Sequence, residues 1–217
     1  MCKSFPVFCF DFDGTIGDTE PDIRGAWLSA IEHLNWDKGK FDSIFRVGPP
    51  LQDTAKMLYP EKTPAELEVL QATYKHFYDD MDNQIALPYA GIIEVLKELA
   101  ALNKRVYVVT NKRGKILKKM MVRFGLLEIC HGMFFPDIVD PENHLTKTAI
   151  LAAAIKCAGY SPEETLMVGD THLDVAAARN NNCPSAAVTW GYSSKAELIA
   201  AEPTYIIDHP AELLKFT

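Results

Sequence analysis

The sequence predicts an α/β protein whose Rossmann-like, three-layer core contains a parallel sheet and is interrupted by an inserted α-helical domain. Three observations lead to this fold class. Short apolar runs alternate with amphipathic stretches of helical length over most of the chain, polar residues follow the apolar runs directly, and residues 16–87 break the alternation. We therefore expect a core domain of residues 1–15 and 88–217 and a helical domain of residues 16–87.

The strands of the core are predicted from apolar runs, which cover residues 5–10, 105–109, 165–168, 185–189 and 205–207. Stretches with helical periodicity lie between them, at residues 92–102, 114–124, 148–158 and 173–181. Strands that alternate with helices of this length form parallel βαβ units. Because such connections are right-handed, the helices should cover both faces of the sheet.

The ends of the predicted helices carry stop signals. Gly125 and Gly159 lie just past two helices and Asn182 lies past a third, where a left-handed backbone is favoured. Pro162 and Pro184 follow closely, and proline cannot extend a helix. These signals support the assigned helix boundaries.

Residues 16–87 contain apolar and aromatic side chains at helical spacing and no apolar run typical of a buried strand. The side chains that recur with this spacing are Trp27, Leu28, Ile31, Leu34, Leu67, Leu70, Tyr74, Phe77 and Tyr78. Such a stripe is more often the core of a helix bundle than an aromatic ligand cage. We therefore expect these side chains to pack against one another.

Composition excludes several classes of protein. The formal net charge of −7 argues against a nucleic-acid-binding protein, which needs a basic surface. No apolar run approaches the roughly 20 residues that span a bilayer, and the first ten residues do not resemble a signal peptide. Five cysteines without paired spacing are typical of reduced thiols. We expect a cytoplasmic protein, and the sequence does not choose between a monomer and a homodimer.

Acidic and polar residues gather where the predicted strands end. Asp11 and Asp13 follow the first strand, Thr110 and Asn111 the second, and Asp170 and Asp174 the third, while Lys147 precedes the helix that leads to the third strand. Ligands of open α/β sheets bind beyond the carboxyl ends of the strands, so these side chains should meet at one edge. Turn and capping chemistry could explain any single residue of the set, but it does not require acids at separate strand ends.

The acids predict a metal, because crowded like charges are unfavourable without a cation. Asp11, Asp13 and Asp170 offer the hard oxygen ligands that Mg²⁺ prefers. A metal and a lysine around a carboxylate suit phosphoryl transfer, because the phosphoryl oxygens must be neutralised before an anion can attack. Asp11 is the expected nucleophile, and Asp13 is the expected general acid and then general base.

Phosphate binding is expected from residues on the other strands. Lys147, the Thr110 hydroxyl and the backbone amides near Asn111 can all contact the phosphoryl oxygens. The basic stretch that begins at Lys112 mostly covers the outer face of one helix and is expected to be solvated. Lys112 itself is the exception, because it should lie at the mouth of the site.

These residues resemble the motifs of the haloacid dehalogenase superfamily, which consists mostly of phosphatases. The segment at residues 11–15 is similar to its first motif, Thr110-Asn111 to its second, Lys147 to its third, and Gly169-Asp170 with Asp174 to its fourth. The resemblance spans nearly the whole chain. It is strongest to the phosphoglycolate phosphatase-like group, to which the segments 109–112, 188–192 and 48–51 are similar.

The resemblance implies a fold and a role for each residue. The insert would be a helical cap of the first type. Asp11 would be the nucleophile, and Asp13 would be the acid/base and supply a backbone carbonyl to Mg²⁺. Asp170 would be a metal ligand, and Asp174 a supporting carboxylate that acts through water. The protein would then be a Mg²⁺-dependent phosphatase with an aspartyl-phosphate intermediate.

Several alternatives remain open from the sequence. A phosphomutase of the β-phosphoglucomutase type would use the same aspartates, although its usual Glu-Asp pair in the fourth motif is absent. A dehalogenase would have no use for Asp13, and phosphonate cleavage would need a cap lysine that nothing here identifies. A non-catalytic binding protein would have no physical need for Asp13 either.

The substrate is not identified by the sequence. Phosphoglycolate, a sugar phosphate, a nucleotide and pyrophosphate are all small phosphorylated compounds that such a site could take. Arg24 and Arg46 in the insert are candidates for binding the substrate anion, and either could equally form a surface ion pair.

Overall fold

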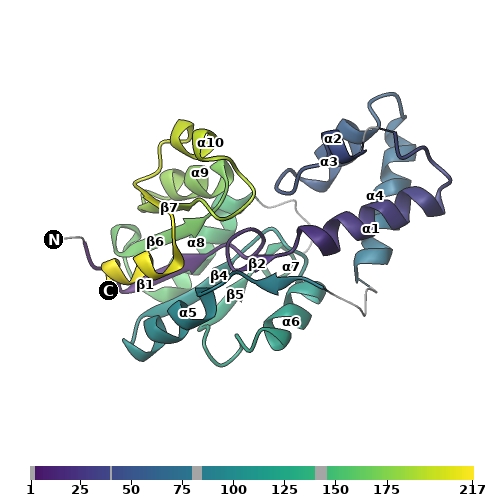
Figure 1. The fold of residues 1–217 in the computed structure, drawn as a ribbon. Coiled ribbons are helices and arrows are strands. Elements are labelled where there is room, and N and C mark those ends of the chain that lie inside the picture. The colour runs from purple at the N-terminus through teal and green to yellow at the C-terminus, as the bar shows by residue number, and fades with distance from the viewer. Residues whose placement is uncertain (1–2, 40, 80–84, 140–145) are drawn as a thin grey trace. The chain divides into compact units, whose positions relative to one another are not determined.

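The computed structural model describes residues 3–39, 41–79, 85–139 and 146–217 (Figure 1). The chain divides into two compact units, one made of Met1–Asp18 and Leu87–Thr217 and the other of Thr19–Ala86. The first unit contains a parallel sheet and is called the sheet unit below. The second contains only helices among its regular elements and is called the helical unit.

The sheet unit contains a six-stranded parallel sheet with the strand order β5-β4-β1-β6-β7-β8. Its strands are β1 (Val7–Phe10), β4 (Arg105–Val109), β5 (Gly132–Phe134), β6 (Thr165–Gly169), β7 (Ser185–Val188) and β8 (Tyr205–Ile207). The predicted α/β class with a parallel sheet is confirmed. Strand β5 was not predicted, because its three residues are only half-buried and form no apolar run.

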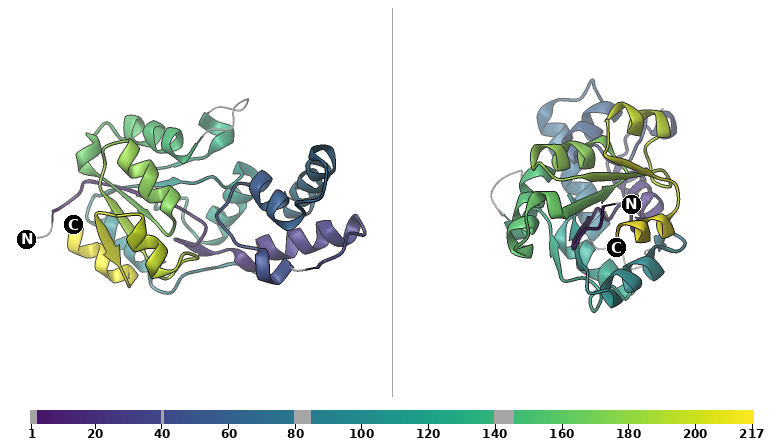
Figure 2. Two further views of the ribbon diagram at one scale, coloured as in Figure 1. Left: turned by 90° about the horizontal axis from the view of Figure 1, so that it is seen from above. Right: turned by 90° about the vertical axis from the view of Figure 1, so that its left-hand side faces the viewer.

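Helices cover both faces of this sheet (Figure 2). Helices α8 and α9 contact one face, and α5 and the C-terminal 3₁₀-helix η2 lie on the other. The helices are α5 (Ile92–Ala101), α6 (Gly114–Arg123), α7 (Pro136–Val139), α8 (Lys147–Ala158), α9 (His172–Asn180) and α10 (Lys195–Ala200), with 3₁₀-helices η1 (Pro162–Glu164) and η2 (Pro210–Phe216). The three-layer core is therefore confirmed.

Strand β1 is buried on both faces at the centre of the sheet. Val7 and Cys9 belong to the cluster that also contains Ile150 and Leu151 of α8. Phe8 and Phe10 alternate with them along the strand, point to the opposite face and are equally buried. A continuous apolar run is what a parallel strand covered on both faces requires.

The helix stop signals have the predicted geometry. Gly159 ends α8 with a φ of 74°, and its backbone N–H donates to Ile155 O. Asn182, just past α9, has a φ of 57°. Both residues adopt the left-handed conformation that glycine and asparagine tolerate best.

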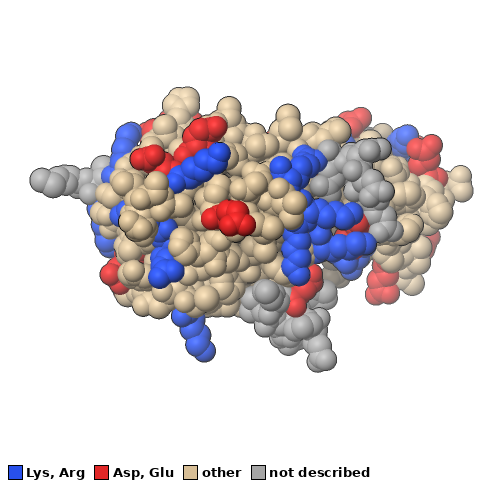
Figure 3. Space-filling view, turned by 90° about the horizontal axis from the view of Figure 1, so that it is seen from below, with Lys and Arg blue, Asp and Glu red and all other residues tan. Residues whose placement is uncertain are grey.

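Helix α6 is amphipathic and carries a basic outer face. Its buried residues are Gly114, Ile116, Leu117, Met120 and Met121, and Lys115, Lys118, Lys119 and Arg123 are exposed. Lysine and arginine side chains gather on the side of the molecule seen in Figure 3. The expectation of a solvated basic helix face is confirmed.

The helical unit is held together by aromatic packing. Its helices are α1 (Glu20–His33), α2 (Phe41–Ile44), α3 (Leu51–Leu58) and α4 (Pro64–Asp79). Helices α1 and α4 pack together, and the rings of Trp27 and Tyr74 stack with centroids 4.5 Å apart. Tyr74 also stacks on Tyr78, at 5.4 Å. The aromatic stripe is thus the bundle core, as its spacing predicts.

A short antiparallel pair of strands, β2 (Gly17–Asp18) and β3 (Leu87–Pro88), lies where the chain leaves and re-enters the sheet unit. With two residues in each strand, the pair produces no apolar run and was not predicted. Within the helical unit, the buried carboxylate of Asp22 accepts hydrogen bonds from Ile85 N at 2.8 Å and Ala86 N at 3.3 Å. The start of α1 is thereby tied to the end of the unit.

Over the residues that the structure describes, no helix has the length and apolar character needed to cross a membrane.

Candidate active site

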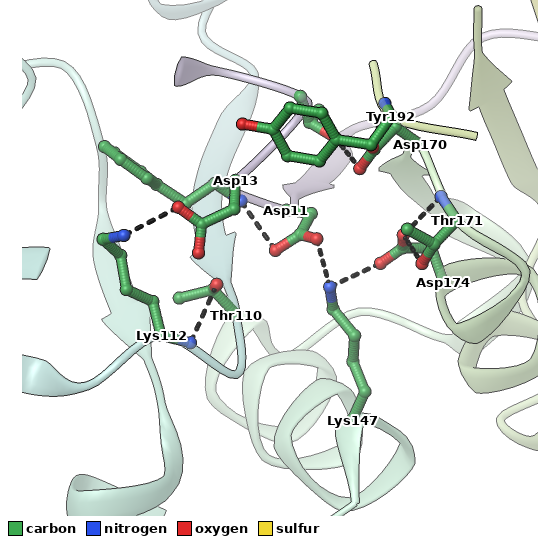
Figure 4. Close-up of polar contacts among 11 residues, drawn as sticks. Asp11, Asp13, Thr110, Lys112, Lys147, Asp170, Thr171, Asp174 and Tyr192 are labelled. Carbon is green, nitrogen blue, oxygen red and sulfur yellow. Dashed lines mark hydrogen bonds and ion pairs between the residues drawn. The ribbon is translucent and has the colours of Figure 1, made fainter. Parts of the chain in front are cut away.

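The register of the sheet brings the ends of three strands to one level. Phe10 of β1 is paired with Val108 of β4 on one side and with Val168 of β6 on the other. Asp11 follows β1, and Thr110 and Asp170 follow the neighbouring strands. All three therefore lie at the carboxyl edge of the sheet, where Figure 4 shows their side chains converging.

Asp11 is buried and its carboxylate is held at both oxygens. Its Oδ1 accepts a hydrogen bond from Phe12 N at 2.7 Å, and its Oδ2 lies 2.5 Å from Lys147 Nζ. Its backbone N–H donates to Val168 O at 2.9 Å, which fixes the main chain to β6. These contacts leave the carboxylate little freedom to rotate, as an attacking group requires.

Lys147 bridges two carboxylates from the first position of α8. Thr146 caps this helix through its side chain, which accepts from Ala149 N. The Lys147 ammonium is buried and also lies 2.6 Å from Asp174 Oδ1. The other oxygen of Asp174 accepts from Thr171 N at 3.0 Å and Thr171 Oγ1 at 2.7 Å in the capping box of α9. Asp174 therefore both caps α9 and pairs with the lysine.

Asp170 is fully buried and is held by two donors. Thr15 Oγ1 donates to its Oδ1 at 3.2 Å, and Tyr192 N donates to its Oδ2 at 2.8 Å. Gly14 and Gly191 lie so close that a Cβ on either would overlap with this carboxylate. The two glycines thus make room for a charged side chain that packing would otherwise exclude.

Three of these acids form one compact cluster. Asp11, Asp170 and Asp174 each offer a carboxylate oxygen, and these oxygens all lie within 4.8 Å of one another. Burial raises the pKa of Asp11 to about 7, against the opposing effect of Lys147 and with the support of the nearby acids. Burial, followed by Asp174 and Asp11, also holds the pKa of Asp170 well above its usual value.

Lys147 responds in the opposite sense. Burial alone would lower its pKa, but the adjacent carboxylates of Asp11 and Asp174 outweigh burial and raise it. The lysine is therefore a permanent cation. Lys147 nevertheless supplies one positive charge, whereas the cluster contains three carboxyl groups, so the ionised cluster would carry a net negative charge.

This net negative charge fits a divalent cation. The donors are carboxylate oxygens without sulfur or imidazole, which suits Mg²⁺ better than zinc. Two of the three predicted metal ligands, Asp11 and Asp170, lie in this cluster. The third acid of the cluster is Asp174, and the side chain of the remaining predicted ligand, Asp13, lies outside it.

Asp13 pairs with Lys112 rather than with the acid cluster. Lys112 Nζ donates to Asp13 Oδ1 at 2.7 Å. Lys112 N also donates to the buried hydroxyl of Thr110 at 3.2 Å, and Asn111, between the two, is exposed. Figure 4 shows Asp13, Thr110 and Lys112 on the side of Asp11 away from Asp170.

The structure therefore brings Asp11, Lys147, Asp170 and Asp174 together, turns the Asp13 side chain to Lys112 and leaves Asn111 exposed. It also adds residues that the sequence patterns do not single out. Thr15 and the backbone amide of Tyr192 hold Asp170. Trp190 Nε1 donates to Thr15 O at 3.1 Å and joins the loop after β7 to the loop after β1. Thr15 could have been found from its place in the first motif, but a backbone amide carries no residue-specific signal.

The arginines of the helical unit have protein partners. Arg24 lies 2.8 Å from Glu20 Oε1 and 2.6 Å from Asp42 Oδ1, and it also lies over the rings of Phe41 and Phe45. Of the two roles expected for Arg24, these contacts favour a surface ion pair over binding of the substrate anion. Arg46 Nη1 donates to Phe45 O at 2.6 Å.

Comparisons with known proteins identify the family to which the sequence is similar. The model of the haloacid dehalogenase-like hydrolase family matches residues 8–188. A curated relative, pyrophosphatase PpaX of Halalkalibacterium halodurans, is 31% identical over 209 residues, which cover 94% of this chain and 93% of that protein.

Solved structures share the fold over nearly the whole chain. A predicted phosphatase from Clostridium acetobutylicum has a TM-score of 0.84 and 25% identity, with 98% of each chain covered. A predicted phosphoglycolate phosphatase from Haemophilus somnus has a TM-score of 0.82 and 24% identity, with 97% of each chain covered.

Proposed function

The chain belongs to the haloacid dehalogenase-like hydrolase family, and on that basis we propose that it is a Mg²⁺-dependent phosphatase that acts through a phosphoryl group on Asp11. The observation that carries this proposal is the fixed Asp11 carboxylate, 2.5 Å from Lys147 at a buried acidic edge. This geometry suits attack by the Asp11 carboxylate on an anionic phosphoryl group.

In the first step Asp11 attacks the phosphorus atom of the substrate. The bond from phosphorus to the leaving oxygen breaks as the bond to the Asp11 carboxylate forms. Asp13 gives its proton to the leaving oxygen, so the product departs as an alcohol or an acid. The resulting aspartyl phosphate, an acyl phosphate on Asp11, retains the phosphoryl group for the second step.

In the second step Asp13 acts as a base. It takes a proton from a water molecule, whose oxygen then bonds to phosphorus as the bond to Asp11 breaks. Inorganic phosphate leaves, and Asp13 regains the proton it needs for the next cycle. The Asp11 carboxylate is restored, so atoms and charge balance over the cycle.

Positive charge and hydrogen-bond donors hold the phosphoryl oxygens in both steps. Lys147 supplies a buried cation, and Thr110 and the amides near Asn111 supply donors at the neighbouring strand end. Mg²⁺, when bound, would neutralise phosphoryl charge. Asp11, Asp170 and the backbone carbonyl of Asp13 would hold it, with Asp174 acting in support.

The helical unit is proposed to be the cap domain of the enzyme. Caps of this kind exclude water from the site and bind the leaving group. Residues 16–87 would thereby set which phosphorylated compound is hydrolysed. The named substrate of the PpaX relatives makes pyrophosphate the first compound to test, followed by phosphoglycolate, sugar phosphates and nucleotides.

A cytoplasmic location is part of the same proposal. The described cysteines Cys9, Cys130, Cys157 and Cys183 are free thiols, and burial raises the pKa of Cys130 and Cys183 to about 12. A raised pKa makes the Cys130 and Cys183 thiols unreactive, as in a reduced protein.

The test is phosphate release from this panel with either Mg²⁺ or EDTA present. Wild type should release phosphate only with Mg²⁺, and Asp11→Asn should lose roughly 10⁴-fold or more in kcat. Glu163→Gln is the matched control, because Glu163 is exposed and lies before β6, at the opposite end of the sheet. Turnover that persists in EDTA or in Asp11→Asn would contradict the mechanism.

A further inference from the structure

Lys112 is the buried lysine of the site that the chemistry above does not use. Its side chain is 2% exposed, and its Nζ lies 2.7 Å from Asp13 Oδ1. The Asp13 side chain is 21% exposed, so one end of this ion pair is buried and the other is open to solvent. The pair joins the loop after β1 to the loop after β4.

Burying a lysine is costly, and this one is held at its backbone N–H and at its ammonium group. Its backbone N–H donates to Thr110 Oγ1, which anchors the residue to the end of β4. Its Nζ lies 5.7 Å from the centroid of the Phe12 ring. The ammonium therefore has a fixed position, whereas Lys115, Lys118 and Lys119 of the adjacent helix are exposed.

Asp13 gains orientation from this contact. Its short side chain belongs to a loop, and a carboxyl group with no fixed neighbour can turn about its χ angles. With Oδ1 on the lysine, the group is held in one orientation and its second oxygen points in a defined direction. An acid or base that is misplaced by about 1 Å can lose roughly 100-fold in rate.

We propose that Lys112 is a positioning residue for Asp13, which it holds in the orientation needed for proton transfer to and from the leaving oxygen. This inference rests on the proposed function, since it needs Asp13 to be the general acid. Lys112 would not touch the reacting atoms. It would act by fixing the group that does.

The dependence on the leaving group tests this role. An alkyl phosphate has a basic leaving oxygen that needs a proton, whereas p-nitrophenyl phosphate has an acidic one that departs without help. In Lys112→Met, which keeps the length of the side chain but not its charge, kcat/KM should fall roughly 100-fold for ethyl phosphate. For p-nitrophenyl phosphate it should fall only a few-fold.

Two further variants separate positioning from general damage. Lys112→Arg keeps a cation beside Asp13 and should recover most of the activity on ethyl phosphate. In an Asp13→Asn background, Lys112→Met should cause no additional loss, because the group it positions is already inactive. Lys118→Met is the matched control, since Lys118 is an exposed lysine of α6, and it should behave as wild type.

Folding of each variant is followed by its thermal unfolding transition. If Lys112→Met does not fold, Lys112→Gln carries the same test, because it also removes the charge and retains a polar end. Equal losses on both phosphates, or a further loss in the Asp13→Asn background, would overturn the inference. A loss confined to substrates whose leaving group carries a negative charge of its own, such as phosphoglycolate, would overturn the inference as well. Lys112 would then bind the substrate directly.

The two proposals fail in different ways. If wild type releases phosphate neither from these two compounds nor from the panel above, the proposed function fails. If wild type is active and Lys112→Met shows no leaving-group dependence, only the role of Lys112 fails.

Discussion

The sheet unit and the helical unit use charge in opposite ways. At the sheet edge, carboxylates and lysines from distant parts of the chain meet in buried contacts, such as Lys147 with Asp11 and Asp174. In the helical unit, ion pairs such as Lys62 with Glu66 and Arg24 with Asp42 are partly exposed, while aromatic rings fill the interior. Buried charges that remain together without an obvious gain in stability indicate a reactive site.

This difference separates chemistry from packing. Exposed ion pairs contribute little to stability, so the helical unit depends on its apolar core. At the sheet edge, burial of charged side chains costs stability, but the ion pairs of Lys147 with Asp11 and Asp174 hold the reactive groups in place. Substitutions in the two units should therefore have different kinds of effect.

The largest effect on stability is expected at the core of the helical unit. Trp27 is buried and stacks on Tyr74, so Trp27→Ala should destabilise this unit by about 3–5 kcal/mol. Hydrogen exchange should accelerate in α1 and α4 and remain slow in the central strands. Met57→Ala, at an exposed position of the same unit, is the control. Uniform acceleration over both units would show that they unfold together.

Lys147→Met should give the next largest effect, and it should appear in activity. The variant loses the cation beside Asp11, and kcat/KM should fall roughly 10²–10³-fold, as on removal of one anion-stabilising donor. Lys156→Met, an exposed lysine of the same helix, should keep full activity. Steady-state kinetics measure both, and a change of less than tenfold in Lys147→Met would contradict its role.

Metal binding should stabilise the sheet unit without any substrate. At a Mg²⁺ concentration of about 100 times the Kd, wild type should gain about 2.7 kcal/mol, seen as a higher Tm. Asp170→Asn should lose most of this gain because it removes a proposed ligand, while Trp27→Ala should retain it. An equal Mg²⁺ effect in wild type and Asp170→Asn would place the metal elsewhere.

The stability of the metal-free protein should depend on pH through Asp11. Its carboxyl has a pKa of about 7 in the folded chain and an ordinary value of 3.8, so the folded state binds the proton more tightly. Ionisation therefore opposes folding, and stability should fall as pH rises from about 4 to 7, by at most about 1.4 kcal/mol per pH unit from this group. Chemical denaturation in EDTA should show this fall in wild type relative to Asp11→Asn, and parallel curves would contradict it.

The smallest effect is expected for Arg24→Ala in the helical unit. The arginine is paired with Glu20 and Asp42 at the surface, and its loss should cost less than about 1 kcal/mol of stability. Activity should change by less than about fivefold, because about 1 kcal/mol corresponds to a factor of about five. A larger loss in kcat/KM would show that Arg24 leaves its ion pairs to bind substrate.

How far the sequence predicts this molecule depends on the kind of signal. The sequence predicts Asp11 and Asp170 at the sheet edge because residues that directly follow buried strands have a fixed place in a parallel sheet. Lys147 is predicted there from its position before the helix that leads to the third strand. The aromatic core of the helical unit followed from helical spacing. Strand β5 and the pair β2–β3 were missed, because strands of two or three residues have too little periodicity to detect.

The sequence predicts which residues lie at the site better than it predicts the contacts between them. The amide of Tyr192 supports Asp170 through the backbone, which any residue could provide. Lys112 was expected at the mouth of the site, but its pairing with Asp13 depends on how two loops approach each other. Side-chain pairing across distant loops is a tertiary property, and local sequence patterns do not encode it.

Detection of a phosphoryl group on Asp11 would test the proposed mechanism at its first step. The enzyme would be mixed with Mg²⁺ and its best substrate, quenched in acid during turnover and digested, and the peptide that contains Asp11 would be analysed by mass spectrometry. We expect one phosphoryl group on Asp11 in wild type and none in Asp11→Asn. Rapid turnover with a phosphoryl group on another residue, or turnover retained by Asp11→Asn, would contradict this mechanism.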